Sequence, residues 1–474
     1  MGLVAGVLTL NGILLVVGLC LLSAHLRGQG ALVALSYAGV ALLVGAGATG
    51  VVLHGVVVAG ARSGPLTLGL VAAALACLGL LGTRFRSRVT RTAAEAGEPV
   101  PGAPDWRGLV QVGSAAILFA LLALTVVAGF RSAPFLDDTW GFWLPRGLPL
   151  DHLGLDARLF ASDPIYATLD HPDYPLWWSL LAGLDMRFIG ELDLRATTGQ
   201  TALLVAAFFP AAARLLWGVV RPWILWPGLL LLAASPELLR QTQSGGADLA
   251  LAVYLALFVV AAGLWLWRGE RVTLAVAFVC AATALLVKGE GLPQLVIVAA
   301  ALGAFGLSHA RRRVGWLWLT VAGAAVAASP WFLWRRAHHI VSLSDVRLGN
   351  ALSPGYLADH SDRVGPAANR FAFHLTNPRE WLIVVPLALV ASVFVAWRAR
   401  RLVWLAPAAV VVAVYAFWVW VNWADSLELQ DRLGTSSYRV IDALILIAGV
   451  SIPVLAERAL RRAPTVPRQT TPGV

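Results

Sequence analysis

The feature that most constrains this chain is a series of long apolar runs that recurs along its whole length. Hydrophobic residues make up 59% of the 474 positions and charged residues only 13%. A helix that crosses a bilayer needs about 20 consecutive apolar residues. Runs of that kind begin near residues 3, 33, 65, 108, 198, 222, 247, 272, 292, 314, 381, 402 and 440. They predict an all-α, polytopic membrane protein with about 13 transmembrane helices.

The placement of arginine predicts how these helices are oriented, because basic residues concentrate in short cytoplasmic loops. Basic clusters follow the third predicted helix and every second helix after it. They are Arg84, Arg86, Arg88 and Arg91, then Arg221, Arg268 with Arg271, Arg311 to Arg313, Arg398 to Arg401, and Arg458 to Arg462. The pattern places the amino terminus outside the cell membrane and the carboxyl terminus inside it. The net charge of +10 follows from this pattern and implies membrane lipids, not nucleic acid, as partners.

The acidic residues have the opposite distribution. Only Glu95, Glu98, Asp105, Glu270 and Glu457, of 26 acidic residues in all, fall on the predicted cytoplasmic side. Ionisable groups also gather at helix ends and not at the depth of the bilayer centre, which favours chemistry at the membrane surface over a transport pathway. We therefore expect the active site of a multi-pass plasma-membrane protein on the extracytoplasmic face.

Composition divides the chain into four parts. Residues 1–84 are predicted to form an amino-terminal three-helix membrane bundle, and residues 85–107 a basic cytoplasmic linker. Residues 108–336 form the main transmembrane module and include a long outer loop at 131–195, within which Pro175–Ile189 has the composition of an amphipathic surface helix. Residues 337–474 comprise a second outer loop, three carboxyl-terminal helices and a cytoplasmic tail. The two outer loops together are expected to cover an outward-facing cavity.

Asp137 and Asp138 lie side by side just after the apolar run that starts at Gly108. Carboxylates are costly in hydrocarbon, but at its edge one of them can accept a proton while a lipid-borne substrate lies alongside. The alternative is that the two acids only end a helix at the water boundary. Trp140 lies beside them, where it would stack on a sugar or anchor the chain at the interface.

Further candidates lie at other predicted outer turns. Lys288 is the only lysine in the chain and precedes Gly289, Glu290 and Gly291; it would bind a phosphate oxygen, or pair with Glu290, or extend toward the interface. Asp248 would contact substrate or cap the helix that it begins. Arg439 would bind a phosphate or pair with Asp442 one turn later.

These elements together resemble those of bacterial GT-C glycosyltransferases, relatives of the protein mannosyltransferase and aminoarabinose transferase group. The resemblance rests on the order of the acidic pair, the stretch His171-Pro172-Asp173-Tyr174-Pro175, the Gly-Gly-Ala-Asp helix start at 245–248 and the Lys-Gly-Glu-Gly turn at 288–291. Members of that superfamily use a sugar carried on a polyprenyl phosphate and place a catalytic acid in the first outer loop of a seven-helix module. The resemblance implies that residues 108–336 are this catalytic module. The three leading helices depart from the family's usual arrangement.

The resemblance implies a role for each candidate. Asp138 aligns with the family's catalytic acid, Asp137 stands where some members have an aromatic residue, and Arg146 aligns with a basic residue of the same element. Which aspartate is the base stays open, with Asp138 favoured. Lys288, Arg439 and Arg146 would bind the donor phosphate, and Asp173, Tyr174, Asp248, Glu290 and Trp140 the rest of the substrate.

The implied reaction is an inverting transfer of a sugar from a polyprenyl-phosphate donor to a glycan, lipid or protein acceptor in the cell envelope. It requires no cofactor; two adjacent acids would suit a divalent metal, but no metal site is predicted. The alternative from another class is a transporter or flippase of lipid-linked sugars, in which the acids hold protons or ions. A third interpretation is a non-catalytic membrane scaffold.

The predicted orientation is testable by labelling single cysteines with a membrane-impermeant thiol reagent in intact cells. In a background without Cys20, Cys77 and Cys280, a cysteine at position 359 should be labelled from outside, and a cysteine at position 95 should not. Labelling at position 95 in intact cells would contradict the orientation.

Overall fold

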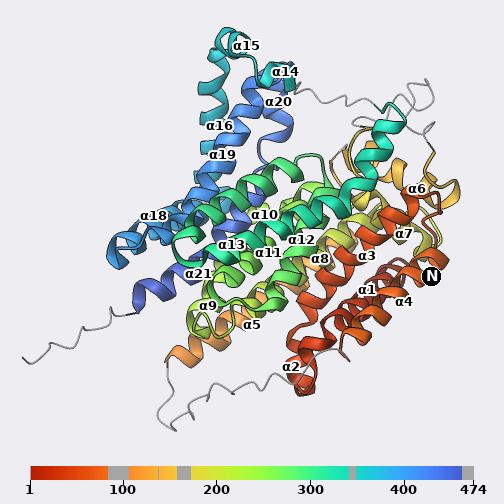
Figure 1. Cartoon of the computed structure of the whole chain (residues 1–474), viewed down its shortest axis with the longest axis horizontal. Helices are drawn as coiled ribbons and strands as arrows, with labels where there is room; N and C mark the ends of the chain where they lie inside the picture. The colour runs from red at the N-terminus through yellow and green to blue at the C-terminus, as the bar shows by residue number, and fades with distance from the viewer. Residues whose placement is uncertain (1, 84–105, 137, 157–171, 341–347, 462–474) are drawn as a thin grey trace, which may run out of the picture.

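The computed structural model describes residues 2–83, 106–136, 138–156, 172–340 and 348–461. In these residues the chain is all-α and contains no β-sheet. The predicted linker 85–107 lies almost wholly outside this part, as does Asp137. Most helices run roughly parallel to one another in one bundle, and a smaller group rises above one end of it (Figure 1).

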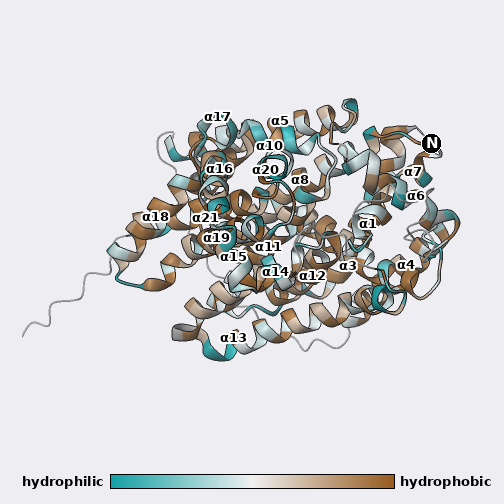
Figure 2. Ribbon diagram, turned by 90° about the horizontal axis from the view of Figure 1, so that it is seen from above, coloured by the Kyte–Doolittle hydropathy of each residue, from teal (hydrophilic) through white to brown (hydrophobic). Residues whose placement is uncertain are grey.

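Nine helical segments are long and apolar enough to cross a membrane within the described ranges. They are α1 (Leu3–Leu26), α3 (Ala38–Val58), α4 (Pro65–Gly82), α5 (Trp106–Arg131), α8 (Arg195–Leu216), α11 (Ala247–Arg268), the segment Ala310–Ala337, the segment Leu402–Ala424 that includes α19 (Ala406–Ala424), and α21 (Asp442–Leu460). Two bent pairs raise the number to 11 if each is one span. Figure 2 shows the hydrophobic colouring that dominates these helices, with hydrophilic colour near α17 (Pro378–Trp381) and α20 (Leu429–Ser436).

The predicted number of about 13 spans is not confirmed, although each predicted run contains a helix. The difference lies in the short helices. The pair α9 (Pro222–Ala233) and α10 (Pro236–Thr242) bends by 62°, and the segment that ends in α18 (Val384–Ala399) bends by 107°. Proline near residues 222, 227 and 236 removes backbone donors and explains why the apolar run at 222 is interrupted.

The element α13 (Gly291–Ala337) is two helices that fold back on each other. Ala310 has non-helical angles of φ −150° and ψ 43°, which separates Gly291–Leu307 from Ala310–Ala337. A Cβ on Gly306 would lie 2.9 Å from Val314, so the two halves are in close contact beside the break. The break places Arg311 to Arg313 at a turn, as the arginine pattern predicted.

The amino-terminal helices pack closely with one another and with the main module. α1 crosses α3 at small residues: a Cβ on Gly45 would lie 1.8 Å from the Leu14 carbonyl oxygen. α3 also packs against α8, α12 (Arg271–Val287) and α13. One hydrophobic core runs from Leu10 of α1 to Ile452 of α21. The first helices are therefore part of the main core of the protein.

The predicted surface helix at 175–189 is present but is not at the surface. α7 (Trp177–Ile189) buries Trp177, Trp178 and most of its other side chains. It packs against α1 and against α6 (Leu144–His152), where Gly147 and Gly183 allow the backbones to approach. Because its side chains are buried on nearly all sides, α7 belongs to the core of the protein. The prediction of a surface helix assumed that only one side of the helix is buried.

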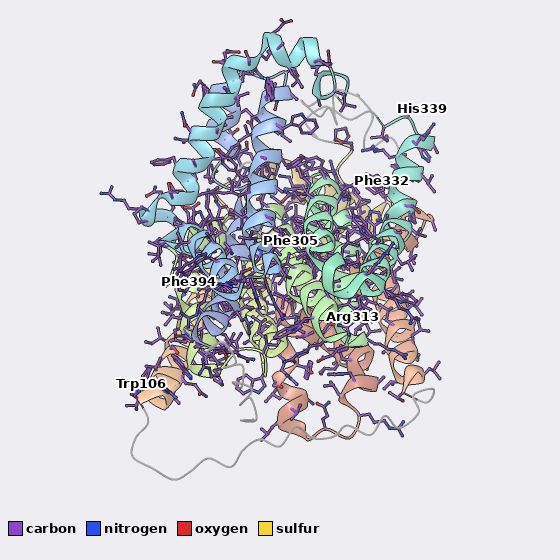
Figure 3. All side chains as sticks on the ribbon, turned by 60° about the vertical axis from the view of Figure 1, so that its left-hand side comes forward. Trp106, Phe305, Arg313, Phe332, His339 and Phe394 are labelled. Carbon is purple, nitrogen blue, oxygen red and sulfur yellow. The ribbon has the colours of Figure 1, made fainter. Side chains whose placement is uncertain are left out.

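The second outer segment builds a separate group of helices. α14 (Leu348–Ala351), α15 (Pro354–Asp359), α16 (Val364–Thr376) and α20 rise together with the end of α19 above the bundle (Figure 1). Figure 3 shows that Arg313 lies in the lower part of the molecule and His339 near the top. Arg313 donates to the Leu266 and Trp267 carbonyls beside Arg268, and Arg221 pairs with Glu457 near the end of α21. These arginine-rich turns lie at one end of the bundle, which we call the arginine-rich end.

The α1–α3 crossing yields a stability prediction. Gly45→Val should lower the free energy of unfolding by about 2 kcal/mol or more, because the new side chain meets the Leu14 backbone. Gly55→Val in the same helix is the matched control, since no atom lies within 4 Å of its Cβ position. Thermal unfolding in detergent measures both. Equal losses from the two variants would contradict the proposed packing.

Candidate functional site

Asp138 is held at the start of a short π-helix, η1 (Thr139–Trp143). The Thr139 hydroxyl donates to the Ser244 carbonyl at 2.9 Å, and the Trp178 indole N–H donates to the Gly245 carbonyl at 3.0 Å. Gly245 has φ +69°, a left-handed conformation that favours glycine. A Cβ there would also lie 3.0 Å from the Thr139 methyl group. These contacts fix the loop of Asp138 beside the first turn of α11.

Arg439 joins two of the predicted acids. Its Nη1 donates to Asp138 Oδ2 at 2.6 Å and lies 3.9 Å from Asp248 Oδ2. The Asp138 side chain is 33% exposed, whereas Asp248 and Arg439 are 11% and 10% exposed. Asp138 is therefore the carboxylate of this group that solvent, or a substrate, reaches most easily.

Lys288 continues the same network on the other side of Asp248. Its Nζ donates to Asp248 Oδ1 at 2.7 Å and lies 3.4 Å from Glu290 Oε1. Glu290 also accepts a hydrogen bond of 2.9 Å from the Tyr174 hydroxyl. The chain of contacts from Asp138 through Arg439, Asp248, Lys288 and Glu290 to Tyr174 is called the charged cluster below.

The charged cluster lies where several helices end. Asp248 is in the first turn of α11, Lys288 directly follows α12, and Arg439 precedes α21. The far ends of these helices carry Arg268, Arg271 and Leu460. The cluster is consequently at the end of the bundle opposite the arginine-rich end.

The network shows which partners these residues have, where the sequence left alternatives open. Asp248 does not cap α11: Gly246 precedes the helix, and the Asp248 carboxylate binds Lys288 and Arg439 instead. Lys288 pairs more closely with Asp248 than with Glu290. Arg439 donates to Asp138, and within the described residues neither carboxylate oxygen of Asp442 has a hydrogen-bond partner. Gly289 and Gly291 allow the close approach of Tyr174 and of the Ala284 carbonyl.

Opposing effects determine the charge of the two cations. Burial lowers the pKa of Lys288, but Asp248 and Glu290 outweigh burial and raise that pKa above its usual value. Burial likewise lowers the pKa of Arg439, while Asp248 and Asp138 raise it, with a net rise. Burial and the negative charge of Glu290 raise the pKa of Tyr174. Lys288 and Arg439 are thus charged and Tyr174 is neutral at physiological pH.

Three other predicted site residues, Arg146, Asp173 and Trp140, are described by the structure but are not members of the charged cluster. Arg146 is 1% exposed; it donates to the Tyr174 carbonyl at 3.0 Å and lies 4.2 Å from the centre of the Phe142 ring. Burial lowers its pKa to about 9. It stands behind Tyr174, where it orients that residue. Asp173 accepts from Arg335, and Trp140 is 53% exposed. Asp137 lies outside the described residues.

Two further groups support the site without having been singled out as site residues from the sequence. Arg432 of α20 lies near Tyr174 and Asp248. Its positive charge lowers the pKa of Tyr174, but burial and Glu290 outweigh this effect and raise that pKa overall. His374 connects Glu380, at 2.8 Å from Nδ1, with the Ser437 hydroxyl, at 3.1 Å from Nε2. Ser437 is two residues before Arg439, so this array fixes the turn that carries the arginine. Neither group follows a recognisable spacing in the sequence.

The cluster retains unused hydrogen-bonding capacity. Within the described residues, Arg439 Nε is buried without an acceptor, and Glu290 Oε2 is buried without a donor. The cluster contains three carboxylate side chains and two basic side chains. In the part of the chain that the structure describes, no three His, Cys, Asp or Glu side chains form a metal-binding group.

Comparison of the chain with models of protein families, with curated proteins and with solved structures finds no match.

The buried pair Lys288–Asp248 is expected to be strongly coupled. Lys288→Met should destabilise the protein by about 3 kcal/mol, because it leaves the Asp248 carboxylate buried without its closest partner. Asp248→Asn in the same chain should restore part of the loss. Thermal unfolding of both single variants and the double variant measures the coupling.

The matched control is Arg195→Met, which removes the cation of a pair whose arginine side chain is 50% exposed. Its thermal unfolding should change little. A Lys288→Met variant no less stable than this control, or a double variant with additive losses, would contradict a coupled buried pair.

Proposed function

We propose that this protein is a membrane glycosyltransferase that moves a sugar from a polyprenyl-phosphate donor to an acceptor outside the cytoplasm. The single observation that carries the proposal is the charged cluster. It joins an accessible carboxylate, Asp138, to two buried cations within one network. A transfer from a phosphate ester to a hydroxyl needs both a base and positive charge for the leaving phosphate.

In this mechanism the acceptor hydroxyl oxygen attacks the anomeric carbon of the donor sugar, and the bond from that carbon to the phosphate oxygen breaks. Asp138 accepts the hydroxyl proton, and the electron pair of the broken bond stays on the carrier phosphate. Attack opposite the leaving group inverts the anomeric centre. Arg439 offers its remaining N–H groups to the phosphate, and the Lys288 ammonium lies on the other side of Asp248.

Position supports the same proposal. The charged cluster lies at helix ends opposite the arginine-rich end, and arginine-rich loops are typically cytoplasmic. A lipid carrier would keep its apolar tail in the bilayer and present its phosphate at this boundary. The proposal covers any sugar, and it covers a glycan, a lipid or a protein as the acceptor.

A second candidate function, a transporter or flippase for lipid-linked sugars, is favoured by one observation. The cluster has more carboxylates than cations, and Asp442 close by is buried with neither oxygen hydrogen-bonded within the described residues. Carboxylates in such surroundings bind protons or cations in transporters. In that case Asp138 would take part in ion coupling and no glycosidic bond would be made.

The catalytic proposal is tested by Asp138→Asn, which keeps the shape of the side chain and removes its basicity. Turnover of a polyprenyl-phosphate sugar should fall about a hundredfold or more, while donor binding should remain. Radiolabelled-sugar transfer and donor titration measure the two quantities.

The matched control is Asp193→Asn, which changes an acid that pairs with Arg195 outside the cluster. This control should keep full turnover. A fully active Asp138→Asn variant would contradict the assignment of Asp138 as the base.

A further inference from the structure

Two adjoining cavities at the arginine-rich end lie between the amino-terminal helices and the main module. The first has a volume of about 580 Å³, and its polar lining comes from α1, α8, α11 and α12. The second has a volume of about 910 Å³ and is mostly apolar. Both cavities are lined by Arg271 and Val276, so they adjoin along α12.

The polar cavity is strongly basic. Arg214, Arg268 and Arg271 line it, and Glu270 is the acid in its lining. Glu270 lies 3.6 Å from Arg268, whereas Arg271 makes no ion pair within the described residues. Arg214 stacks over the Tyr37 ring at 4.0 Å, and its Nε is buried without an acceptor in the described part of the chain. The positive charge of this cavity suits a phosphate group.

The apolar cavity extends from this basic region into the bilayer. It follows α12 from Arg271 to Val279, which is about 12 Å at the helical rise of 1.5 Å per residue. Leu21 and Val44 of the amino-terminal helices form one wall, and Phe278, Leu319 and Gly323 form the other. Arg312 and Arg313 lie at the same end as Arg271. A chain-shaped apolar molecule with an anionic head fits this arrangement, and a small soluble anion leaves the apolar part unfilled.

We propose that these cavities together bind one anionic phospholipid of the cytoplasmic leaflet. Its headgroup phosphate lies among Arg214, Arg268 and Arg271, and one acyl chain lies along α12 in the apolar cavity. The cytoplasmic leaflet is rich in anionic lipid, which attracts such arginines. The lipid would contact both the amino-terminal helices and the main module.

The test uses the full-length chain in detergent with phosphatidylglycerol and phosphatidylcholine of identical acyl chains. Native mass spectrometry at increasing lipid concentration measures binding. Phosphatidylglycerol should bind about tenfold more tightly than phosphatidylcholine. Arg214→Gln with Arg271→Gln should reduce that ratio to about one. Arg398→Gln, an exposed arginine at the same end but outside both cavities, should leave the ratio unchanged.

A second pair of variants tests the place of the acyl chain. Gly323→Trp fills the apolar cavity and should weaken binding of both lipids, since a Cβ at Gly323 meets only the Phe278 ring at 3.4 Å. Gly315→Trp in the same helix points into open space and should not. Thermal unfolding verifies that each variant is folded.

The proposal is overturned if the double arginine variant, folded, keeps the full preference for phosphatidylglycerol. It is also overturned if Gly323→Trp binds both lipids as the parent does. Competition by millimolar inorganic phosphate that removes all phosphatidylglycerol would identify a site for a soluble anion, and would likewise overturn the assignment of a lipid.

Discussion

The candidate site depends on one interaction, the contact of the Arg439 guanidinium with the carboxylates of Asp138 and Asp248. These residues come from three distant parts of the chain, and each lies where a helix begins or just before. An unpaired charge at this boundary would be expensive. Mutual pairing makes the burial tolerable and at the same time fixes the distance between the accessible carboxylate and the cation. The surrounding turns can be understood as supports for this arrangement.

The supports are of two kinds. Close backbone approach at Gly245 places the loop of Asp138 against the start of α11, because no side chain intervenes. A hydrogen bond between His374 Nε2 and the Ser437 hydroxyl holds the turn before Arg439. The first support belongs to the bundle, whereas the second comes from α16 in the group of helices above it. The position of Arg439 is therefore coupled to the segment that would cover the site.

The sequence predicted much of the fold and the identity of the cluster residues. Apolar runs and arginine loops are local signals, so helix positions and the turn at Arg311 to Arg313 were predictable from them. Lys288 drew attention as the only lysine, and Asp248 as the acid after two glycines. The burial of Arg146 behind Tyr174 and of α7 in the core were not predictable, because both depend on packing between distant segments. The predicted number of about 13 spans is not confirmed, because proline and short helices interrupt some of the apolar runs.

The central claim is that the charged cluster transfers a sugar and does not move one across the membrane. The most direct measurement follows a radiolabelled sugar from a synthetic polyprenyl phosphate, using purified protein in detergent micelles that have no inside or outside. The account predicts that label leaves the carrier and becomes covalently bound to an acceptor, with free polyprenyl phosphate as the other product. Intact donor in micelles, together with protein-dependent translocation of the same donor in sealed vesicles, would contradict it.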